Sequence, residues 1–183
     1  MQKIITGFRS LTFLIHCLFQ RVRVQGVYRV NGMQPEVRNL GTLTIHPGVQ
    51  FRSFRVRTTI GVAVGADLTL GNRAFLNDGV NIFCAKRIAI GPDTRIADWC
   101  VIYDTDFHAV APGADTLIKP VVIGRNVWLG ARAIILAGSH IGDHSVIAAG
   151  SVVRGNIPPR SVAGGNPAKV IRTFECADDW IRK

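Results

Sequence analysis

The sequence is poor in charged residues, and acids are the scarcer kind. Only 19% of its 183 residues are charged, and 12 Asp and Glu stand against 22 Lys and Arg, which gives a formal net charge of +10. Glycine is plentiful, at 19 residues. Few charges with many glycines are typical of a fold with tight backbone corners rather than of a helical bundle. The basic excess favours an anionic partner, whether nucleic acid, a membrane surface or a phosphate-bearing cofactor, and does not choose between them.

Cysteine is also scarce, and its positions follow no pattern. The four cysteines have no CxxC pairing and no regular spacing (Cys17, Cys84, Cys100 and Cys176). None has a local setting that suggests a nucleophile. We therefore expect all four to be reduced and partly buried, in agreement with a cytoplasmic protein.

The chain lacks a hydrophobic run long enough to span a membrane, which needs about 20 apolar residues. The densest run, Leu11 to Phe19, is broken by Thr12 and His16 and is followed by no small-residue cleavage site, so we expect neither a span nor a signal peptide. Residues 1–24 are predicted to form a helix instead. Apolar residues recur there along one stripe of a 3.6-residue period (Ile4, Phe8, Leu11, Ile15 and Leu18).

The flanks of this expected helix are basic, with Lys3, Arg9, Arg21 and Arg23. A basic amphipathic helix can lie on an anionic membrane surface. The alternative, which we favour at this point, is that the stripe packs on the rest of the fold or on another subunit. The absence of a secretion signal predicts a cytoplasmic protein, peripheral at the inner face of the membrane if the helix binds lipid.

The sequence does contain a strong period of six. From residue 123 to residue 158 a branched aliphatic recurs every six residues, and the residue after it tends to be small (Ile123, Leu129, Ile135, Ile141, Ile147 and Val153). The same rhythm occurs earlier, slips by two residues after Ile88 and then resumes (Val64, Leu70, Leu76, Ile82, Ile88, Ile90, Ile96 and Ile102). We interpret the slip as a small insertion at a corner. A period of six fits neither a helix nor an amphipathic strand, but it does fit an internal repeat.

This period predicts an all-β fold. Six residues make one short strand and a turn, so three hexapeptides make one triangular coil of about 18 residues, and coils stack at roughly 4.8 Å. The aliphatics fill the prism and small residues occupy its corners. We expect a lead-in of helix and strand over residues 1–41, a parallel β-helix over residues 42–160, and a tail over residues 161–183 that ends in a short helix from residue 174. The period alone does not give the hand of the coil.

The rhythm fails between Ile102 and Ile123. These residues are 21 positions apart, which is not a multiple of six. Some of the intervening chain must therefore leave the regular winding, and we expect an extruded loop over residues 104–120.

Four segments of the repeat have a recognisable sequence. They are Ile-Gly-Arg-Asn-Val-Trp-Leu-Gly-Ala from Ile123, Ile-Gly-Asp-His-Ser-Val-Ile-Ala-Ala-Gly-Ser-Val-Val from Ile141, Ile-Pro-Pro from Ile157, and Ala-Gly-Gly-Asn-Pro-Ala-Lys-Val-Ile-Arg from Ala163. Together they resemble the hexapeptide-repeat O-acetyltransferases, in particular the galactoside and maltose acetyltransferase group and its polysaccharide-modifying relatives. The resemblance covers about residues 70–172. It implies a left-handed coil, a homotrimer with active sites between subunits, and acetyl-CoA as co-substrate.

The resemblance also implies a catalytic centre. Acetyl transfer to a hydroxyl needs a base near that hydroxyl and donors for the developing oxyanion. His108 stands where the family carries its catalytic histidine. Asp106 is expected to orient it and Asp104 to contact substrate, although both can equally be loop-capping residues. Asn77 matches an asparagine near the acceptor, while Gly79 stands where the family tends to have a second polar residue, and a plain Asn-Asp-Gly turn is the alternative.

The family binds acetyl-CoA along the groove between adjacent prisms, mostly through backbone groups. Lys169 and Arg172 are expected to meet the CoA phosphates, and the N–H of Ala131 the thioester oxygen. Arg154 replaces a residue that is often Thr, and Trp128 serves either as a groove wall or in trimer packing. The full cofactor set implied by the resemblance is Trp128, Gly130, Ala131, Ala149, Arg154, Lys169 and Arg172.

No metal is expected. His140 and His144 occupy different places in successive hexapeptides, and no third ligand is evident in the sequence. A nucleic-acid partner is not expected either, because the arginines of residues 51–57 are accompanied by only two aromatic residues.

We therefore expect an acetyl-CoA-dependent O-acetyltransferase that acts directly on a sugar hydroxyl of a polysaccharide precursor or a glycoside. The alternatives are a serine, amino-sugar or xenobiotic acetyltransferase, and a non-catalytic β-helical module associated with a membrane.

Overall fold

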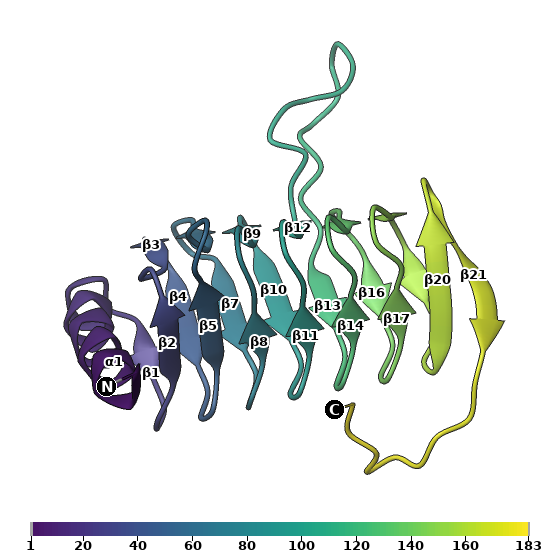
Figure 1. The fold of residues 1–183 in the computed structure, drawn as a ribbon. Helices are drawn as coiled ribbons and strands as arrows, with labels where there is room; N and C mark the ends of the chain where they lie inside the picture. The colour runs from purple at the N-terminus through teal and green to yellow at the C-terminus, as the bar shows by residue number, and fades with distance from the viewer. Residues whose placement is uncertain (1, 183) are drawn as a thin grey trace.

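The computed structural model describes residues 2–182, except for the side chains of residues 2–6 and 8. The chain forms a triangular prism of parallel strands, with helix α1 (Gln2–Phe19) across one end and a long loop that projects from one edge (Figure 1). The strands make three sheets, which we call A, B and C, and the chain visits them in that order in every coil. The all-β repeat architecture expected from the period of six is confirmed.

The three sheets are the three faces of the prism. Sheet A contains β1 (Arg23–Val24), β4 (Thr42–Ile45), β7 (Asp67–Leu70), β10 (Arg87–Ile90), β13 (Val121–Ile123), β16 (His140–Ile141) and β19 (Asn156–Ile157). Sheet B contains β2 (Arg29–Gly32), β5 (Gln50–Ser53), β8 (Phe75–Leu76), β11 (Arg95–Ile96), β14 (Trp128–Leu129), β17 (Val146–Ile147), β20 (Ser161–Gly165) and β21 (Ala168–Thr173). Sheet C contains β3 (Glu36–Asn39), β6 (Thr59–Val62), β9 (Asn81–Cys84), β12 (Val101–Tyr103), β15 (Ile134–Ile135) and β18 (Val152–Val153).

The hexad aliphatics fill the prism, as the sequence predicts. From Leu70 to Val153 every one of them is at most 1% exposed, and the small residues four positions on in the later coils are buried at the corners. One assignment was wrong. Val64 lies in a turn and is 80% exposed, and the inward position of that strand belongs to Val62, because the rhythm of the earlier coils is not strictly six.

The slip after Ile88 is an enlarged corner between sheets C and A. Leu70 pairs with Ile90, 20 positions later, whereas Ile123 pairs with Ile141, 18 positions later. The two extra residues therefore enter the chain between β9 and β10. Pairing also extends beyond residues 42–160 at both ends, since β1, β2 and β3 already form a coil and β20 continues sheet B.

Helix α1 covers the open edge of the first coil. Side chains of α1 and of Gln20, which follows it, satisfy backbone groups of β2 and β3 that no earlier coil can pair. Ser10 Oγ accepts from Val30 N at 3.1 Å, His16 Nε2 lies 3.2 Å from Val37 O, and Gln20 Oε1 accepts from Asn39 N at 3.1 Å. An unpaired buried backbone group is costly, so these contacts let the prism begin where it does.

The described part of the apolar stripe expected on this helix does not pack on the prism. Phe13 and Cys17 are fully buried instead, and Phe13 packs edge-on against Tyr28 and Phe51. Three residues of the predicted stripe are largely exposed (Leu11 56%, Ile15 48% and Leu18 68%). For these residues the expectation of packing within the chain was wrong, and the side chains of Ile4 and Phe8 lie outside the described residues.

The helix is also shorter than the predicted 1–24. It ends at Phe19, and residues 23–24 form β1. No helix in the described part of the chain is long and apolar enough to cross a membrane.

The C-terminal tail is extended, so the short helix expected from residue 174 was wrong. After β21 pairs antiparallel with β20, the tail folds back along the edge between sheets A and B (Figure 1). One backbone bond lies within the tail, from Trp180 N to Ala177 O at 3.1 Å, and the others join the tail to the prism. Trp180 O accepts from Asn126 Nδ2 at 2.9 Å, Arg182 N donates to Asn126 Oδ1 at 3.0 Å, and Asp178 O accepts from Arg125 at 2.8 Å.

The four cysteines are unpaired, and three of them are buried. Burial raises the pKa of Cys17, Cys84 and Cys100 to about 12. At pH 8 these thiols stay protonated and shielded, so a thiol reagent should label Cys176 quickly and the other three only after denaturation. Labelling followed by mass spectrometry checks this, with Cys176→Ser as the control. Fast labelling of a second cysteine in the native protein would contradict the buried positions.

Candidate active site

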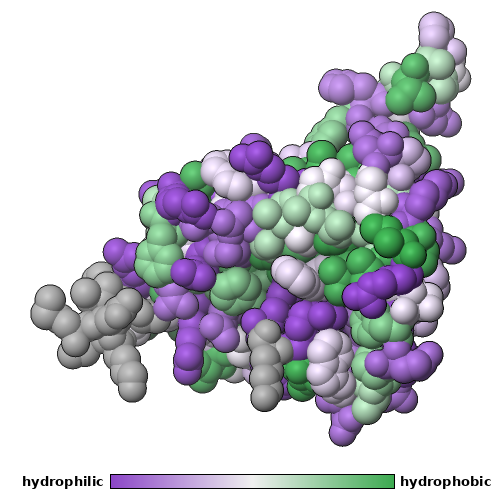
Figure 2. Space-filling view, turned by 45° about the vertical axis from the view of Figure 1, so that its right-hand side comes forward, coloured by the Kyte–Doolittle hydropathy of each residue, from purple (hydrophilic) through white to green (hydrophobic). Residues whose placement is uncertain are grey.

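The extruded loop leaves the prism at the edge where the chain passes from sheet C to sheet A, which we call the C–A edge. Its two limbs are joined at the root. Asp106 N donates to Leu117 O and Lys119 N to Asp104 O, both at 3.0 Å, and Thr105 bridges to Ile118. In the space-filling view the loop stands clear of the body (Figure 2). The loop predicted over residues 104–120 is therefore present, and its root is fixed.

Asp104 is buried at this root and holds the enlarged corner together. It is 0% exposed, and its carboxylate accepts from the backbone N–H groups of Ala85, Lys86 and Arg87 at 2.6, 2.8 and 2.7 Å. The thiol of Cys84 adds a weaker contact at 3.7 Å. Both carboxylate oxygens are thus occupied away from solvent, so we assign Asp104 a structural role in place of the predicted contact with substrate.

Asp106 and His108 are joined through the backbone. His108 N donates to Asp106 O at 2.7 Å, whereas the Asp106 carboxylate pairs with Arg154 at 3.0 Å. The sequence predicted that the Asp106 carboxylate would orient the imidazole of His108. In the structure that carboxylate bonds to Arg154 instead. His108 itself is exposed to solvent. Arg154, predicted to bind cofactor, lies at the same C–A edge and braces the loop root.

Phe107 fixes the place of its neighbour His108. Its φ is +61°, in the left-handed region that is unfavourable for a bulky residue. The ring packs between Phe83 and Tyr103, with centroid distances of 5.0 and 5.1 Å. These aromatic contacts on the outer face of sheet C hold the strained backbone, so the histidine that follows is presented from a rigid root.

Most of the other predicted residues line a different edge, the B–C edge, where the chain passes from sheet B to sheet C. Asn77, Gly130, Ala131 and Ala149 follow sheet B strands at this edge. The corners stack closely. Gly150 N donates to Ala131 O at 2.8 Å, and a Cβ on Gly130 would stand 2.6 Å from Ala149 N. Among the described residues, the N–H groups of Ala131 and Ala149 donate to nothing.

A cavity of about 350 Å³ lies on the outer face of sheet B beside this edge. Phe75, Arg95 and Trp128 are cross-strand neighbours in it, and Trp128 is 44% exposed. Arg182, carried there by the tail, lines the same cavity. Burial lowers the pKa of Arg182 and the charge of Arg95 lowers it further. None of the seven lining residues is acidic (Phe75, Asn77, Arg95, Ile96, Ala97, Trp128 and Arg182).

Trp99 is a residue of this edge that sequence reasoning missed. Its indole is 44% exposed and packs over Gly79, where a Cβ would stand 2.7 Å from the ring. The glycine that departs from the family pattern thus makes room for an aromatic surface beside Asn77. The sequence did contain a signal for this contact: Trp99 occupies the same corner position as Gly79, one coil later.

Asp78 repeats at the B–C edge the structural role of Asp104. Its carboxylate accepts from Arg55 N at 2.8 Å and Val56 N at 3.3 Å and pairs with the Arg55 guanidinium. Burial alone would raise the pKa of Asp78, but these bonds outweigh it and hold the pKa below its ordinary value. The bonds of Asp78 therefore fix the Asn77-Asp78-Gly79 turn, and with it the position of Asn77 in the cavity.

The two predicted phosphate-binding residues lie beyond the last coil. Lys169 and Arg172 are exposed on β21, opposite Gly164 and Val162 of β20. Lys169 stands at the B–C end of this strand pair, whereas Arg172 is level with Val146, the first residue of β17.

His140 and His144, the two histidines weighed as possible metal ligands in the sequence and not expected to bind a metal, lie apart. His144 is 3% exposed, and its Nδ1 lies 2.9 Å from Asn126 Nδ2, beneath the tail. His140 is exposed on β16. Within residues 2–182 no three His, Cys, Asp or Glu side chains are grouped as a metal site would require.

One prism therefore does not complete the predicted site. His108 stands at the C–A edge, and the corners expected to hold acetyl-CoA stand at the B–C edge. Sheet C separates them, and β12, its strand at the root of the loop, spans about 10 Å. A second copy of the chain, placing its C–A edge against this B–C edge, would bring the two halves together.

The comparisons with known proteins point to one family. Residues 120–155 match the family described as bacterial transferase hexapeptide (six repeats). The galactoside O-acetyltransferase of Escherichia coli strain K12 is 32% identical over 126 residues, which cover 67% of this chain and 62% of that protein. The "Putative lipopolysaccharide biosynthesis O-acetyl transferase WbbJ" of the same strain is 38% identical over 112 residues, covering 54% and 57%.

Among solved structures, a galactoside acetyltransferase in complex with coenzyme A matches with a TM-score of 0.59 and 29% identity. The match covers 74% of this chain and 72% of that one. The fold is that of the left-handed β-helix acetyltransferases, so the predicted hand is confirmed. The chain spans about 60% of the length of the two curated relatives.

The role of Asp104 can be tested by stability. Asp104→Ala should lower the free energy of unfolding by about 3 kcal/mol or more, since each buried N–H left without a partner costs roughly 1–3 kcal/mol. Asp106→Ala is the matched control, because its partly exposed ion pair is worth less than about 1 kcal/mol. Urea unfolding of both variants measures the difference. Equal stability would show that the corner does not depend on Asp104.

Proposed function

The chain belongs to the hexapeptide-repeat transferase family, and from this premise we propose that it is an acetyl-CoA-dependent O-acetyltransferase that acts on a sugar hydroxyl. The observation that carries the proposal is the presentation of His108. A solvent-exposed imidazole follows a strained, aromatic-clamped residue at the root of the loop that interrupts the repeat. A rigid root positions a base better than a free loop tip does.

In the proposed reaction His108 is the general base. It accepts the proton of the acceptor hydroxyl while that oxygen attacks the thioester carbonyl of acetyl-CoA. The carbon–sulfur bond then breaks, and the proton passes from the imidazole to the leaving thiolate. Acetyl-CoA supplies the acetyl group as co-substrate, and no covalent acyl-enzyme is needed. Asp106 acts through its backbone carbonyl and its pairing with Arg154, which fix the loop root.

The B–C edge would hold acetyl-CoA. The N–H of Ala131 is a donor for the developing oxyanion, and the N–H of Ala149 lies one coil further along the same line. Trp128 forms a wall of the groove, and Gly130 lets adjacent coils approach closely. Lys169 and Arg172 are available on β21 for the phosphates. The solved relative with coenzyme A bound supports a CoA site in a prism of this kind.

The assembly follows from the separation of the two edges. We propose a homotrimer in which His108 of one subunit faces the B–C edge of the next, so that each site takes residues from two chains. Closed cyclic symmetry repeats one such contact around the ring and leaves no half-site unused.

The acceptor is proposed to be a saccharide. Asn77 lines the cavity beside the B–C edge, and the indole of Trp99 is exposed at the same edge; an aromatic face near hydrogen-bonding groups suits a sugar ring. The relatives named for galactoside acetylation and for lipopolysaccharide biosynthesis support a glycoside or a polysaccharide precursor.

Removal of the base tests the mechanism. His108→Ala should lower kcat for acetyl transfer by about 10²–10⁴-fold while leaving the KM for acetyl-CoA nearly unchanged. The assay follows release of free CoA thiol with galactosides and other simple sugars as acceptors. His140→Ala is the matched control, since His140 is exposed and lies on sheet A. Full turnover in His108→Ala would overturn the proposed mechanism.

Complementation tests the shared site. Ala131→Pro removes the proposed oxyanion donor, and proline suits the first central position of a turn whose next residue, Arg132, has a φ of +61°. This variant and His108→Ala should each be nearly inactive. Mixed oligomers formed by co-expression should regain roughly a quarter of the wild-type activity, because that share of random neighbour pairs contributes two intact halves. A mixture that stays inactive would mean that both residues act within one subunit.

A further inference from the structure

Helix α1 is apolar on two opposite sides. Successive residues of an α-helix are rotated by about 100°, which places the buried Phe13 and Cys17 close together and Leu11, Ile15 and Leu18 about half a turn away from them. The first pair packs on the prism, and the other three residues are exposed. Phe19, which follows them, is 83% exposed. A soluble helix normally buries one stripe and turns a polar face outward, so the outer face of α1 is exceptional.

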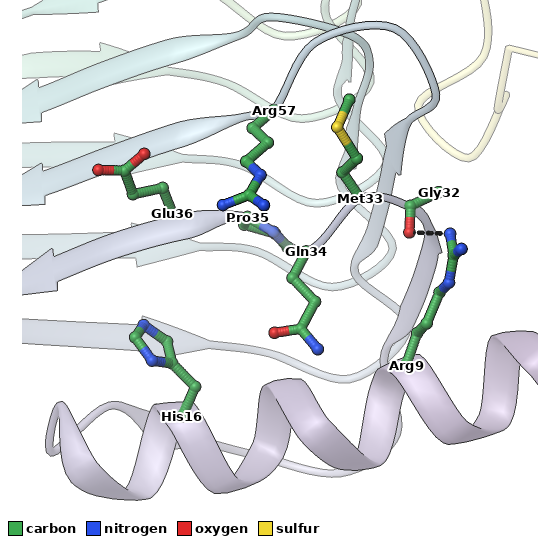
Figure 3. A pocket seen from close by; sticks show the side chains of 8 residues that line it. All are labelled: Arg9, His16, Gly32, Met33, Gln34, Pro35, Glu36 and Arg57. Atoms are coloured by element: carbon green, nitrogen blue, oxygen red, sulfur yellow. Dashed lines mark hydrogen bonds between the residues drawn. The ribbon is translucent and has the colours of Figure 1, made fainter.

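The rotation of α1 about its axis is fixed by polar contacts. Figure 3 shows Arg9 and His16 rising from the helix toward the segment that connects β2 and β3, around a cavity of about 430 Å³. Arg9 donates to Gly32 O, and Tyr28 donates to Ser10 O at 2.6 Å. Gln34 donates to Thr12. These contacts join the inner side and one flank of the helix to the first coil. They fix the rotation of the helix so that Leu11, Ile15 and Leu18 point away from the prism.

The chain that forms and flanks this helix is basic, and the acid beside it, Glu36, lines the cavity on its inner side with Arg9 and His16. The first acidic residue of the chain is Glu36, whereas the preceding 35 residues contain one lysine and four arginines. Arg21 and Arg23, directly after the helix, are both exposed. A second copy of the chain docked through the same face would bring Arg21 and Arg23 of both copies close together. An anionic lipid surface would neutralise them and bury the apolar stripe at the same time.

We propose that α1 is an interfacial helix that holds the protein on an anionic bilayer surface. Leu11, Ile15, Leu18 and Phe19 enter the boundary between headgroups and acyl chains, while Arg21 and Arg23 contact lipid phosphates. Because α1 lies across the end of the prism, the coils stand away from the bilayer and their edges stay open to the solvent (Figure 1). This binding is independent of the proposed acetyl transfer.

Co-sedimentation of the full-length chain with vesicles tests the proposal. Phosphatidylcholine vesicles are compared with vesicles that contain about 30% phosphatidylglycerol, at low and high salt. Wild type should bind the anionic vesicles at low salt and bind them more weakly at high salt. It should bind phosphatidylcholine vesicles little at either salt concentration. Leu11→Ser/Ile15→Ser/Leu18→Ser should lower the partition coefficient about a hundredfold. Arg21→Gln/Arg23→Gln should lower it about fivefold for each charge removed.

The matched control is Val64→Ser/Val110→Ser, which removes two apolar side chains that are 80% and 84% exposed elsewhere on the chain. It should bind like wild type. Circular dichroism and thermal unfolding verify that each variant is folded, and sedimentation velocity gives its oligomeric state. Equal vesicle binding by the stripe variant and wild type would overturn the proposal. A stripe variant that dissociates into smaller oligomers, with no vesicle binding by wild type, would assign the face to contacts between copies instead.

Discussion

The inside of a triangular coil holds only the one or two inward-facing side chains of each short strand, and the rest of this structure depends on that limited space. Coils that keep to the limit stack in register and bury their aliphatics almost completely. Extra residues in a coil must either be held at a corner by additional hydrogen bonds or leave the coil as a loop. The corner with two extra residues is braced by the carboxylate of Asp104, and residues 104–120 leave the winding altogether. The same carboxylate thus joins the two irregularities of the repeat.

Much of the fold could be predicted because a period of six has few physical solutions. The inward residues from Leu70 onward, the corner insertion and the place of the loop all follow from counting aliphatics, whereas the less regular coils before them misplaced Val64. Side-chain partners were less accessible. Asp104 and Asp106 look alike in the sequence, yet one is buried among backbone amides and the other pairs with an arginine two coils away. Such a difference depends on which residues of other coils the stacking places beside each carboxylate, and the local sequence does not predict those partners.

The errors at the two ends of the chain have one physical cause. A 3.6-residue stripe identified an amphipathic helix correctly, but α1 has a second, narrower apolar side in Phe13 and Cys17, and the open edge of the first coil selected that side through hydrogen bonds. At the other end, residues 174–182 gain more from bonding to Asn126 and Arg125 than from a helix of their own. In both cases backbone groups of the prism that needed partners outweighed local propensity.

Both ends of a stacked-coil protein also determine how long it can become. A parallel coil with free backbone groups is a template on which the next identical coil, or the next molecule, can add, so an uncapped prism is the start of a filament. Here polar side chains of α1 and of Gln20, which follows it, occupy that template at one end. At the other end β21 runs antiparallel to β20, so sheet B offers an edge of the wrong direction for another parallel coil. Both features disfavour the addition of a further coil along the prism axis.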